Sequence, residues 1–255
     1  MMLLAIDVGN TNTVIGLFRN SELLVHWRIS TDPYKTADEF WIFLFNLLNL
    51  QKYGVNSIEQ MVISSVVPPV VMALDEMAKE YLEISPLVVG PGIKTGINIK
   101  LDNPRELGAD RLVNAVAAHE IIGGPVIIVD FGTATTFCAV TEDGEYLGGA
   151  IAPGIETSIE ALFKRAAKLP RVEIDLPSSV IGRSTEEAMQ SGIIYGFASQ
   201  IDGVVSRIKK ELSPSSQTIA TGGLAEMICR HTATIDHVDG LLTLKGLYYI
   251  ATMNS

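Results

Sequence analysis

The 255-residue sequence has few of the residues that mark disulfide-bonded, zinc-binding or nucleic-acid-binding proteins. Its two cysteines, Cys138 and Cys229, and its four histidines fit neither a disulfide framework nor the spacing of a metal site. No run of lysine or arginine interrupts a chain of formal net charge −10, so we expect no nucleic-acid partner. These absences favour a reducing compartment, the cytoplasm.

Long apolar runs are also missing, although the mean hydropathy is +0.30. The apolar run at residues 40–50 is much shorter than the ~20 residues that a membrane-spanning helix needs. Residues 121–140 contain Asp130 and several glycines, and Asp7 interrupts the apolar start of the chain. We therefore expect a soluble chain with no targeting segment and no membrane partner.

Apolar residues make up 47% of the chain, enough for a substantial core. Short apolar runs, typical of buried strands, alternate with segments of helical periodicity. The expected strands cover residues 3–7, 14–18, 23–29, 61–67, 126–130 and 218–221. The expected helices cover residues 36–53, 68–81, 108–122 and 184–212, with others from residue 155 and at the C-terminus. This alternation is typical of an α/β protein whose sheets are covered by helices.

One pattern occurs twice, about half the chain apart. Residues 6–14 and residues 129–137 each contain an apolar strand, an aspartate, an apolar residue, a glycine, a polar turn and a second apolar strand. In a gapless alignment of the two segments, Asp7 aligns with Asp130, Gly9 with Gly132 and Val14 with Phe137. Such repetition indicates a duplicated fold.

The residue types of this pattern suit phosphate binding. Glycine lets backbone N–H groups approach phosphate oxygens, and a carboxylate at the strand end can hold hydrated Mg²⁺ or a monovalent cation. A single Asp-x-Gly is also an ordinary turn, and only the repetition favours the phosphate interpretation. The pattern resembles the sugar kinase, heat-shock ATPase and actin superfamily. That resemblance implies two ribonuclease-H-like halves, with mixed sheets flanked by helices and ATP bound in a cleft between them.

Other glycine-rich or catalytic motifs are weaker. Residues 90–96 miss both the P-loop and the dinucleotide spacing, and we interpret them as a mobile loop beside the substrate pocket. No Gly-x-Ser-x-Gly elbow supports a serine hydrolase.

An acidic residue, Asp110, and a basic residue, Arg111, follow Gly108 at an expected helix start. Asp110 there would stay ionised and able to accept a proton, and Arg111 could meet a carboxylate or phosphate with two hydrogen bonds. An aspartate in a first helical turn also occurs simply because it compensates the helix dipole. The residues alone leave both interpretations open.

The motifs taken together resemble type III pantothenate kinases from end to end. The matching segments, in order, are residues 7–13, Asn103-Pro104, Gly108-Ala109-Asp110-Arg111, residues 130–136, residues 148–154, Ser184-Thr185 and Thr221-Gly222-Gly223. One position departs from many members, which carry an aromatic residue where this chain has Leu101.

The resemblance implies specific roles. Asp110 would be the general base that deprotonates the primary hydroxyl of pantothenate, and Asp130 would bind K⁺ or NH₄⁺. Asp7 would hold Mg²⁺ through water. Pantothenate would contact Gly108, Ala109, Asp110, Arg111 and Thr185, the last from the partner in a homodimer whose acceptor site lies at the interface. ATP would contact Asp7, Val8, Gly9, Asn10, Thr11, Asn12, Thr13, Val14 and Thr133.

We place the two halves at residues 1–118, with the first hairpin and the acceptor base, and 119–255, with the second hairpin, the cation site and the dimer contacts. Three alternatives stay open: another sugar or acid kinase of the superfamily, a regulatory relative without catalysis, and a filament-forming actin-like ATPase. The intact set of Asp7, Asp110, Arg111 and Asp130 favours the kinase.

Overall fold

The computed structural model describes residues 2–166 and 169–255. By its contacts the chain divides into two compact units. Unit 1 comprises Met1–Gly96, Asn103–Ala117 and Thr243–Ser255, and unit 2 comprises Ile97–Asp102 and Ala118–Leu242. The C-terminal helix thus belongs to unit 1. The division of the chain at residue 118 into two functional halves stays a prediction.

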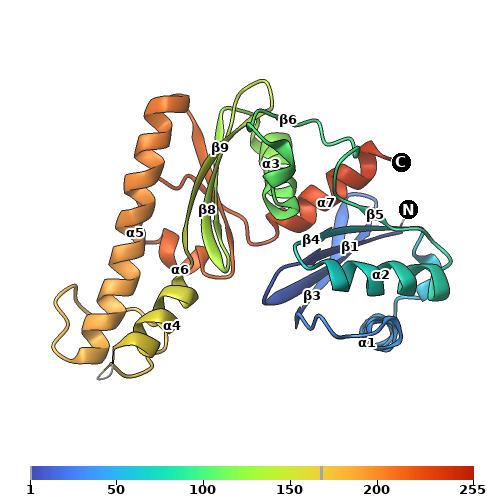
Figure 1. The fold of residues 1–255 in the computed structure, drawn as a ribbon, viewed down its shortest axis with the longest axis horizontal. Helices are drawn as coiled ribbons and strands as arrows, with labels where there is room; N and C mark the ends of the chain where they lie inside the picture. Colours follow the sequence, from blue (N-terminus) through green and yellow to red (C-terminus); the bar gives the residue numbers. More distant parts are fainter. Residues whose placement is uncertain (1, 167–168) are drawn as a thin grey trace. The chain divides into compact units, whose positions relative to one another are not determined.

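Unit 1 contains a five-stranded mixed sheet of order β3-β2-β1-β4-β5 (Figure 1). The strands β1 (Met2–Val8), β2 (Asn12–Arg19) and β3 (Glu22–Ser30) form an antiparallel meander, and β4 (Gln60–Ser65) and β5 (Leu87–Val88) join β1 in parallel. Asp7 pairs with Val14 on β2 and with Ser64 on β4. The first hairpin is therefore flanked by the end of β4.

Helices α1 (Ala37–Leu50) and α2 (Pro68–Tyr81) cover one face of this sheet, where they form a buried core with β1, β2 and β4. Local signals set their starts. Thr36 and Glu39 form a capping box at α1, and Pro68 occupies the first turn of α2, where its missing N–H is not needed. Trp41 and Tyr81 stack with ring centroids 4.8 Å apart and so join the two helices.

The remaining helices of unit 1 are α7 (Leu242–Met253) and the first part of α3 (Ala109–Ile122). Gly246 of α7 lies against the backbone of Val113, because a Cβ atom at position 246 would be 2.2 Å from the Val113 carbonyl oxygen. On the other side of α7, the ring of Tyr248 stacks on Phe18 of β2, with centroids 5.3 Å apart. These contacts place α7 between β2 and the start of α3.

Unit 2 contains a six-stranded mixed sheet of order β11-β10-β7-β8-β9-β6. Its strands are β6 (Asn98–Ile99), β7 (Val126–Phe131), β8 (Ala134–Val140), β9 (Glu145–Pro153), β10 (Gln217–Gly222) and β11 (His237–Val238). Antiparallel pairing joins β7, β8 and β9, and parallel pairing joins β7, β10 and β11. Apart from β6, the order and the strand directions repeat those of unit 1.

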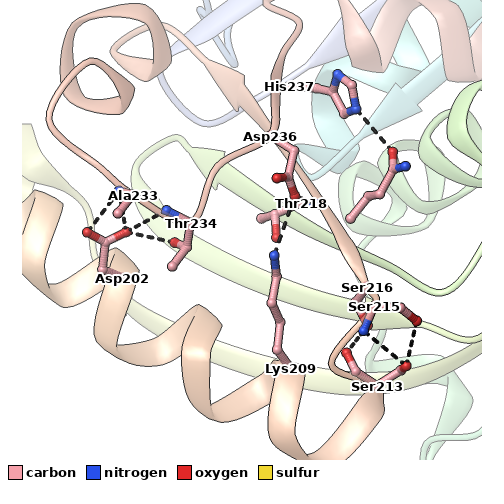
Figure 2. A network of polar contacts seen from close by, with 11 residues as sticks. Asp202, Lys209, Ser213, Ser215, Ser216, Thr218, Ala233, Thr234, Asp236 and His237 are labelled. Atoms are coloured by element: carbon pink, nitrogen blue, oxygen red, sulfur yellow. Dashed lines mark hydrogen bonds and ion pairs between the residues drawn. The ribbon is translucent and has the colours of Figure 1, made fainter.

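Helix α4 (Ile155–Arg165), the long helix α5 (Thr185–Leu212) and the short α6 (Ala225–Cys229) pack on one face of this sheet (Figure 1). Figure 2 shows how α5 is joined to the chain around β10 and β11. Asp202 accepts hydrogen bonds from the N–H groups of Ala233 and Thr234 and from the Thr234 hydroxyl, at 2.9, 3.0 and 2.7 Å. Seven residues further along α5, Lys209 donates to Asp236 at 3.4 Å, and Asp236 also accepts from the Thr218 N–H at 2.7 Å.

The duplicated α/β fold predicted from the repeat is confirmed. Each unit runs through three antiparallel strands, helical segments and two further parallel strands, so the equivalent pairs are β1 with β7, β2 with β8 and β4 with β10. Some expected boundaries shift: α1 ends at Leu50 rather than Tyr53 because Lys52 takes a positive φ of 61°, β4 ends at Ser65 rather than Val67, and β2 begins at Asn12 rather than Val14. Strand β9 and the two-residue strands β5, β6 and β11 were not predicted.

Candidate active site

The first hairpin turns tightly at Gly9. Its N–H donates to the carbonyl oxygen of Asn12 at 3.0 Å, and a Cβ atom at position 9 would be 3.1 Å from that oxygen. Asn10, Thr11 and Asn12 are exposed at the tip of the turn. The turn thus presents polar groups to solvent at the end of β1, next to the half-buried Asp7.

Thr31 supports this turn from the end of β3. Its hydroxyl donates to the Gly9 carbonyl oxygen at 2.8 Å and lies 2.9 Å from the hydroxyl of buried Thr13, while its N–H donates to the Thr11 carbonyl oxygen at 2.9 Å. Sequence reasoning missed Thr31, because nothing in the local pattern shows that the end of β3 returns to the turn between β1 and β2.

The second hairpin turns at Gly132, whose N–H donates to the Ala134 carbonyl oxygen at 3.1 Å. The start of α4 packs on it: the Thr133 carbonyl oxygen accepts from the Gly154 N–H at 3.1 Å and from the Thr157 hydroxyl at 2.8 Å. A Cβ atom at position 154 would lie 2.4 Å from the carbonyl oxygens of both Gly132 and Thr133. Only glycine allows α4 to begin this close to the turn.

The structure corrects the gapless alignment of the two hairpins. Asp7 pairs with Val14, whereas Asp130 pairs with Thr136, so the first turn is one residue longer. The structural equivalent of Val14 is therefore Thr136, not Phe137. The aspartates remain equivalent.

The strand beside each aspartate carries a buried hydroxyl residue. Ser64 on β4 pairs with Asp7, and Thr221 on β10 pairs with Asp130. Their exposed fractions are 0% and 2%. Just beyond Thr221, Gly222 has a φ of +97° and approaches the backbone of Phe131 so closely that a Cβ atom would be 2.6 Å from its carbonyl oxygen. Each aspartate is therefore held between two strands at the carboxyl end of its own.

The predicted acceptor element forms the start of α3. The Arg111 N–H donates to Oδ1 of Asp110 at 2.8 Å, and the Arg111 guanidinium donates through Nη2 to the Glu106 carbonyl oxygen at 3.1 Å. A Cβ atom at position 108 would lie 2.5 Å from Oδ1 of Asp110. The Asp110 carboxylate thus folds back over Gly108 at the N-terminal end of α3.

The segment before α3 is fixed by Asn103. Its side-chain oxygen accepts from the Arg105 N–H at 3.3 Å, and its side-chain amide donates to Oε1 of Glu106 at 2.9 Å. The Asn-Pro pair therefore shapes the short turn that carries the carbonyl partner of Arg111.

Thr185 is the exposed first residue of α5, and Ser184 is its N-cap, accepting from the Glu187 N–H at 3.1 Å. The segment before it carries three exposed apolar side chains: Leu176, Val180 and Ile181 are 54%, 64% and 81% exposed. Thr185, Asp130 and Thr133 belong to unit 2, whereas the first hairpin and residues 108–111 belong to unit 1.

In the described part of the chain, no group of three His, Cys, Asp or Glu side chains could hold a metal ion by itself. A hydrated Mg²⁺ that accompanies a phosphate needs only one or two protein carboxylates. Asp7, at a strand end beside an exposed turn, suits that smaller requirement, and Asp130 occupies the equivalent place in unit 2.

The family model for type III pantothenate kinase matches residues 3–207. The chain belongs to the type III pantothenate kinase family. It is accordingly a phosphotransferase of a family that serves coenzyme A biosynthesis. The match covers both hairpins, residues 108–111 and Thr185.

Solved structures show the same fold at low sequence identity. A conserved putative Baf family transcriptional activator from Campylobacter jejuni is 19% identical with a TM-score of 0.62, covering 98% of each chain. The activator of 2-hydroxyisocaproyl-CoA dehydratase from Clostridium difficile, with bound ADPNP, is 12% identical with a TM-score of 0.57, covering 100% of this chain and 95% of that one. An inorganic polyphosphate/ATP-glucomannokinase from Arthrobacter sp. strain KM is 14% identical with a TM-score of 0.52, covering 98% and 97%. These likenesses show that the chain shares its fold with these proteins.

No helix in the described residues is both long and apolar enough to cross a membrane.

Proposed function

We propose that the chain transfers the γ-phosphoryl group of ATP to the primary hydroxyl of pantothenate, giving 4′-phosphopantothenate and ADP at the first step of coenzyme A biosynthesis. Membership of the type III pantothenate kinase family supports the reaction class. The observation that carries the proposal is the Asp110 carboxylate, held over Gly108 at the start of α3 beside Arg111.

Asp110 is the proposed general base. Its carboxylate takes the proton of the pantothenate hydroxyl while that oxygen forms a bond to the γ-phosphorus and the bond to the bridging oxygen of ADP breaks. Phosphoryl transfer needs little covalent work from the protein, so positioning and charge neutralisation supply most of the rate. A base fixed by its own helix start, as Asp110 is by the Arg111 N–H, meets the positioning requirement.

Gly108, Ala109, Asp110 and Arg111 are the proposed pantothenate site. Arg111 can pair with the carboxylate of pantothenate through the rest of its guanidinium while Nη2 is oriented by the Glu106 carbonyl oxygen. The glycine leaves room for both the Asp110 carboxylate and the substrate. Because the chain carries a net charge of −10 and both substrates are anions, such local positive charge is needed.

The two hairpins are the proposed ATP-binding elements. The exposed turn of the first hairpin offers backbone N–H groups and short polar side chains to phosphates, and Thr133 offers the same from the second. Asp7 would hold Mg²⁺ through water, and Asp130 would hold K⁺ or NH₄⁺. When bound, these cations neutralise charge on the phosphate chain.

We further propose a cytoplasmic homodimer in which Thr185 contacts the pantothenate of the partner subunit. The exposed apolar side chains of Leu176, Val180 and Ile181, just before Thr185, support an interface at this end of α5.

The test is ATP-dependent phosphorylation of pantothenate with Mg²⁺, with K⁺ present or replaced by Na⁺. Wild-type protein should form product only with K⁺ or NH₄⁺. Asp110→Asn should lower the rate by about 10²–10⁴-fold while nucleotide binding persists. The exposed Asp143→Asn serves as the control and should match wild type. A folded wild-type dimer that forms no product with K⁺ or NH₄⁺ would contradict the kinase assignment and favour the regulatory alternative.

A further inference from the structure

Ser64 carries a buried hydroxyl with no structural partner. Its exposed fraction is 0%, and its Oγ makes no hydrogen bond to any of the described residues. The next residue provides a contrast: Oγ of Ser65 accepts from the Val67 N–H at 2.9 Å and donates to the Val67 carbonyl oxygen at 3.2 Å, which ends β4. Buried polar groups are nearly always hydrogen-bonded, so an exception beside a proposed phosphate-binding aspartate points to an absent water, ion or ligand.

The position of Ser64 indicates which ligand could be the hydrogen-bond partner of its hydroxyl. Ser64 and Asp7 are paired on neighbouring parallel strands, about 4.8 Å apart across the ladder, and their side chains share one face of the sheet. The adjacent residues Ile6, Val8 and Ile63 belong to the core beneath α1 and α2, on the opposite face. Ser64 and Asp7 therefore face away from that core together.

The same arrangement occurs in unit 2, where buried Thr221 pairs with Asp130. On the other flank of each aspartate the residue types differ, since Val14 pairs with Asp7 and Thr136 with Asp130. The feature that both copies share is thus an aspartate beside a buried hydroxyl residue on the following parallel strand.

We propose that Ser64 is a positioning residue of the phosphate-binding site and that its hydroxyl accepts a hydrogen bond from a water ligand of the Mg²⁺ that Asp7 holds. This rests on the proposed function. Mg²⁺ dehydrates reluctantly and keeps several waters, and each of those waters needs an acceptor for its protons. The Asp7 carboxylate and the Ser64 oxygen, side by side at the strand ends, can together orient such a hydrated ion.

The experiment is calorimetric titration of the full-length chain with a non-hydrolysable ATP analogue over a series of Mg²⁺ concentrations. Ser64→Ala should raise the Mg²⁺ concentration needed for half-maximal binding about fivefold, the effect of one lost hydrogen bond. Affinity for the analogue without Mg²⁺ should not change. The melting temperature without ligand should stay equal or rise, because the variant removes a buried hydroxyl that has no partner.

Thr218→Val is the matched control. Thr218 on β10 is also 0% exposed, and its Oγ1 also makes no hydrogen bond to the described residues, but it pairs with Ile127 rather than with an aspartate. Its Mg²⁺ requirement should equal that of wild type. In the Asp7→Asn background, Ser64→Ala should have no further effect on the Mg²⁺ requirement, since both side chains act on one ion.

An unchanged Mg²⁺ requirement in Ser64→Ala, or an undiminished effect in the Asp7→Asn background, would overturn the inference while leaving the kinase proposal intact. A wild-type chain that binds no Mg²⁺-nucleotide would instead overturn the proposed function, and the role of Ser64 with it.

Discussion

The hydroxyl of Thr31 donates a hydrogen bond to the carbonyl oxygen of Gly9, with 2.8 Å between the two oxygens. These residues are 22 positions apart, and the bond joins the end of β3 to the turn between β1 and β2. The same hydroxyl lies 2.9 Å from that of Thr13. The conformation of the first hairpin turn thus depends on a residue outside the hairpin.

Thr31→Val should therefore disturb the turn without changing the volume of the side chain. The Gly9 carbonyl and the Thr13 hydroxyl both lose a partner, so we expect the free energy of unfolding to fall by about 1–2 kcal/mol. The dissociation constant for ATP should rise several-fold. Thr252→Val, which removes an exposed hydroxyl bonded to the Tyr248 carbonyl in α7, should change neither quantity appreciably. Urea unfolding and nucleotide titration measure the two effects, and equal ATP affinity in the two variants would contradict this role of Thr31.

Gly154→Ala should displace the start of α4 from the second hairpin. The new Cβ atom would lie 2.4 Å from two carbonyl oxygens of the turn, and overpacking of this kind costs about 1–3 kcal/mol. The φ of Gly154 is −68°, so the loss would come from the steric clash and not from backbone strain.

Gly192→Ala is the matched substitution for that test. Gly192 lies inside α5, and no described atom lies within 4 Å of its added Cβ beyond the helix's own nearby backbone. Alanine there should stabilise the chain by about 0.5–1 kcal/mol, because glycine loses more conformational freedom in a helix. Thermal unfolding should thus shift in opposite directions for the two variants. A Gly154→Ala protein as stable as wild type would show that α4 can move away from the turn freely.

Asp202→Ala should loosen the connection between α5 and the chain before β11. Two backbone N–H groups and one hydroxyl lose a charged acceptor (Figure 2), so we expect a loss of about 2–3 kcal/mol. Hydrogen exchange of residues 233–238 should become faster. Glu211→Ala, an exposed substitution in the last turn of the same helix, should alter neither stability nor exchange. Unchanged protection of residues 233–238 in Asp202→Ala would refute the proposed connection.

The reactivity of Cys229 should depend on pH with an unusually alkaline midpoint. Burial raises the pKa of its thiol to about 11, with a hydrogen bond to Thr232 opposing the rise and the Asp202 carboxylate adding to it. Because the thiolate is the nucleophile, alkylation of the native protein should be slow near pH 8 and increase toward pH 11. Peptide-resolved mass spectrometry measures the rate at Cys229, and a midpoint near the ordinary value of 9.0 would contradict the effect of burial.

The free energy of unfolding should also change with pH between about 9 and 11. The folded chain holds the Cys229 proton more tightly than the unfolded chain, so this contribution is complete below about pH 9 and is lost as the pH rises toward 11. Cys229→Ser should remove this part of the pH dependence of the melting temperature.

Much of the fold follows from local sequence. The apolar runs of β1 and β7 and the helical periodicity of α2 and α5 act within a few residues, and each of these elements was predicted at or near its observed place. Strand β9 was not, because its glycines have low strand propensity. Gly149 is needed there for a contact that only the tertiary structure shows: a Cβ atom would lie 1.6 Å from the Phe137 carbonyl oxygen.

The residues of the candidate site also fall into two groups, those that local sequence identifies and those that only the structure reveals. The aspartates, the hairpin glycines and the Gly-Ala-Asp-Arg segment could be identified by sequence alone, because each is a short pattern and one of them is repeated. Thr31, Ser64 and Gly154 could not, since each meets its partner through strand pairing or helix packing across distant parts of the chain. Local sequence is therefore enough to identify which chemical groups are present and the two turns that carry them. Tertiary structure decided which neighbours hold those turns, because hydrogen bonds and close backbone approaches depend on distances that folding alone sets.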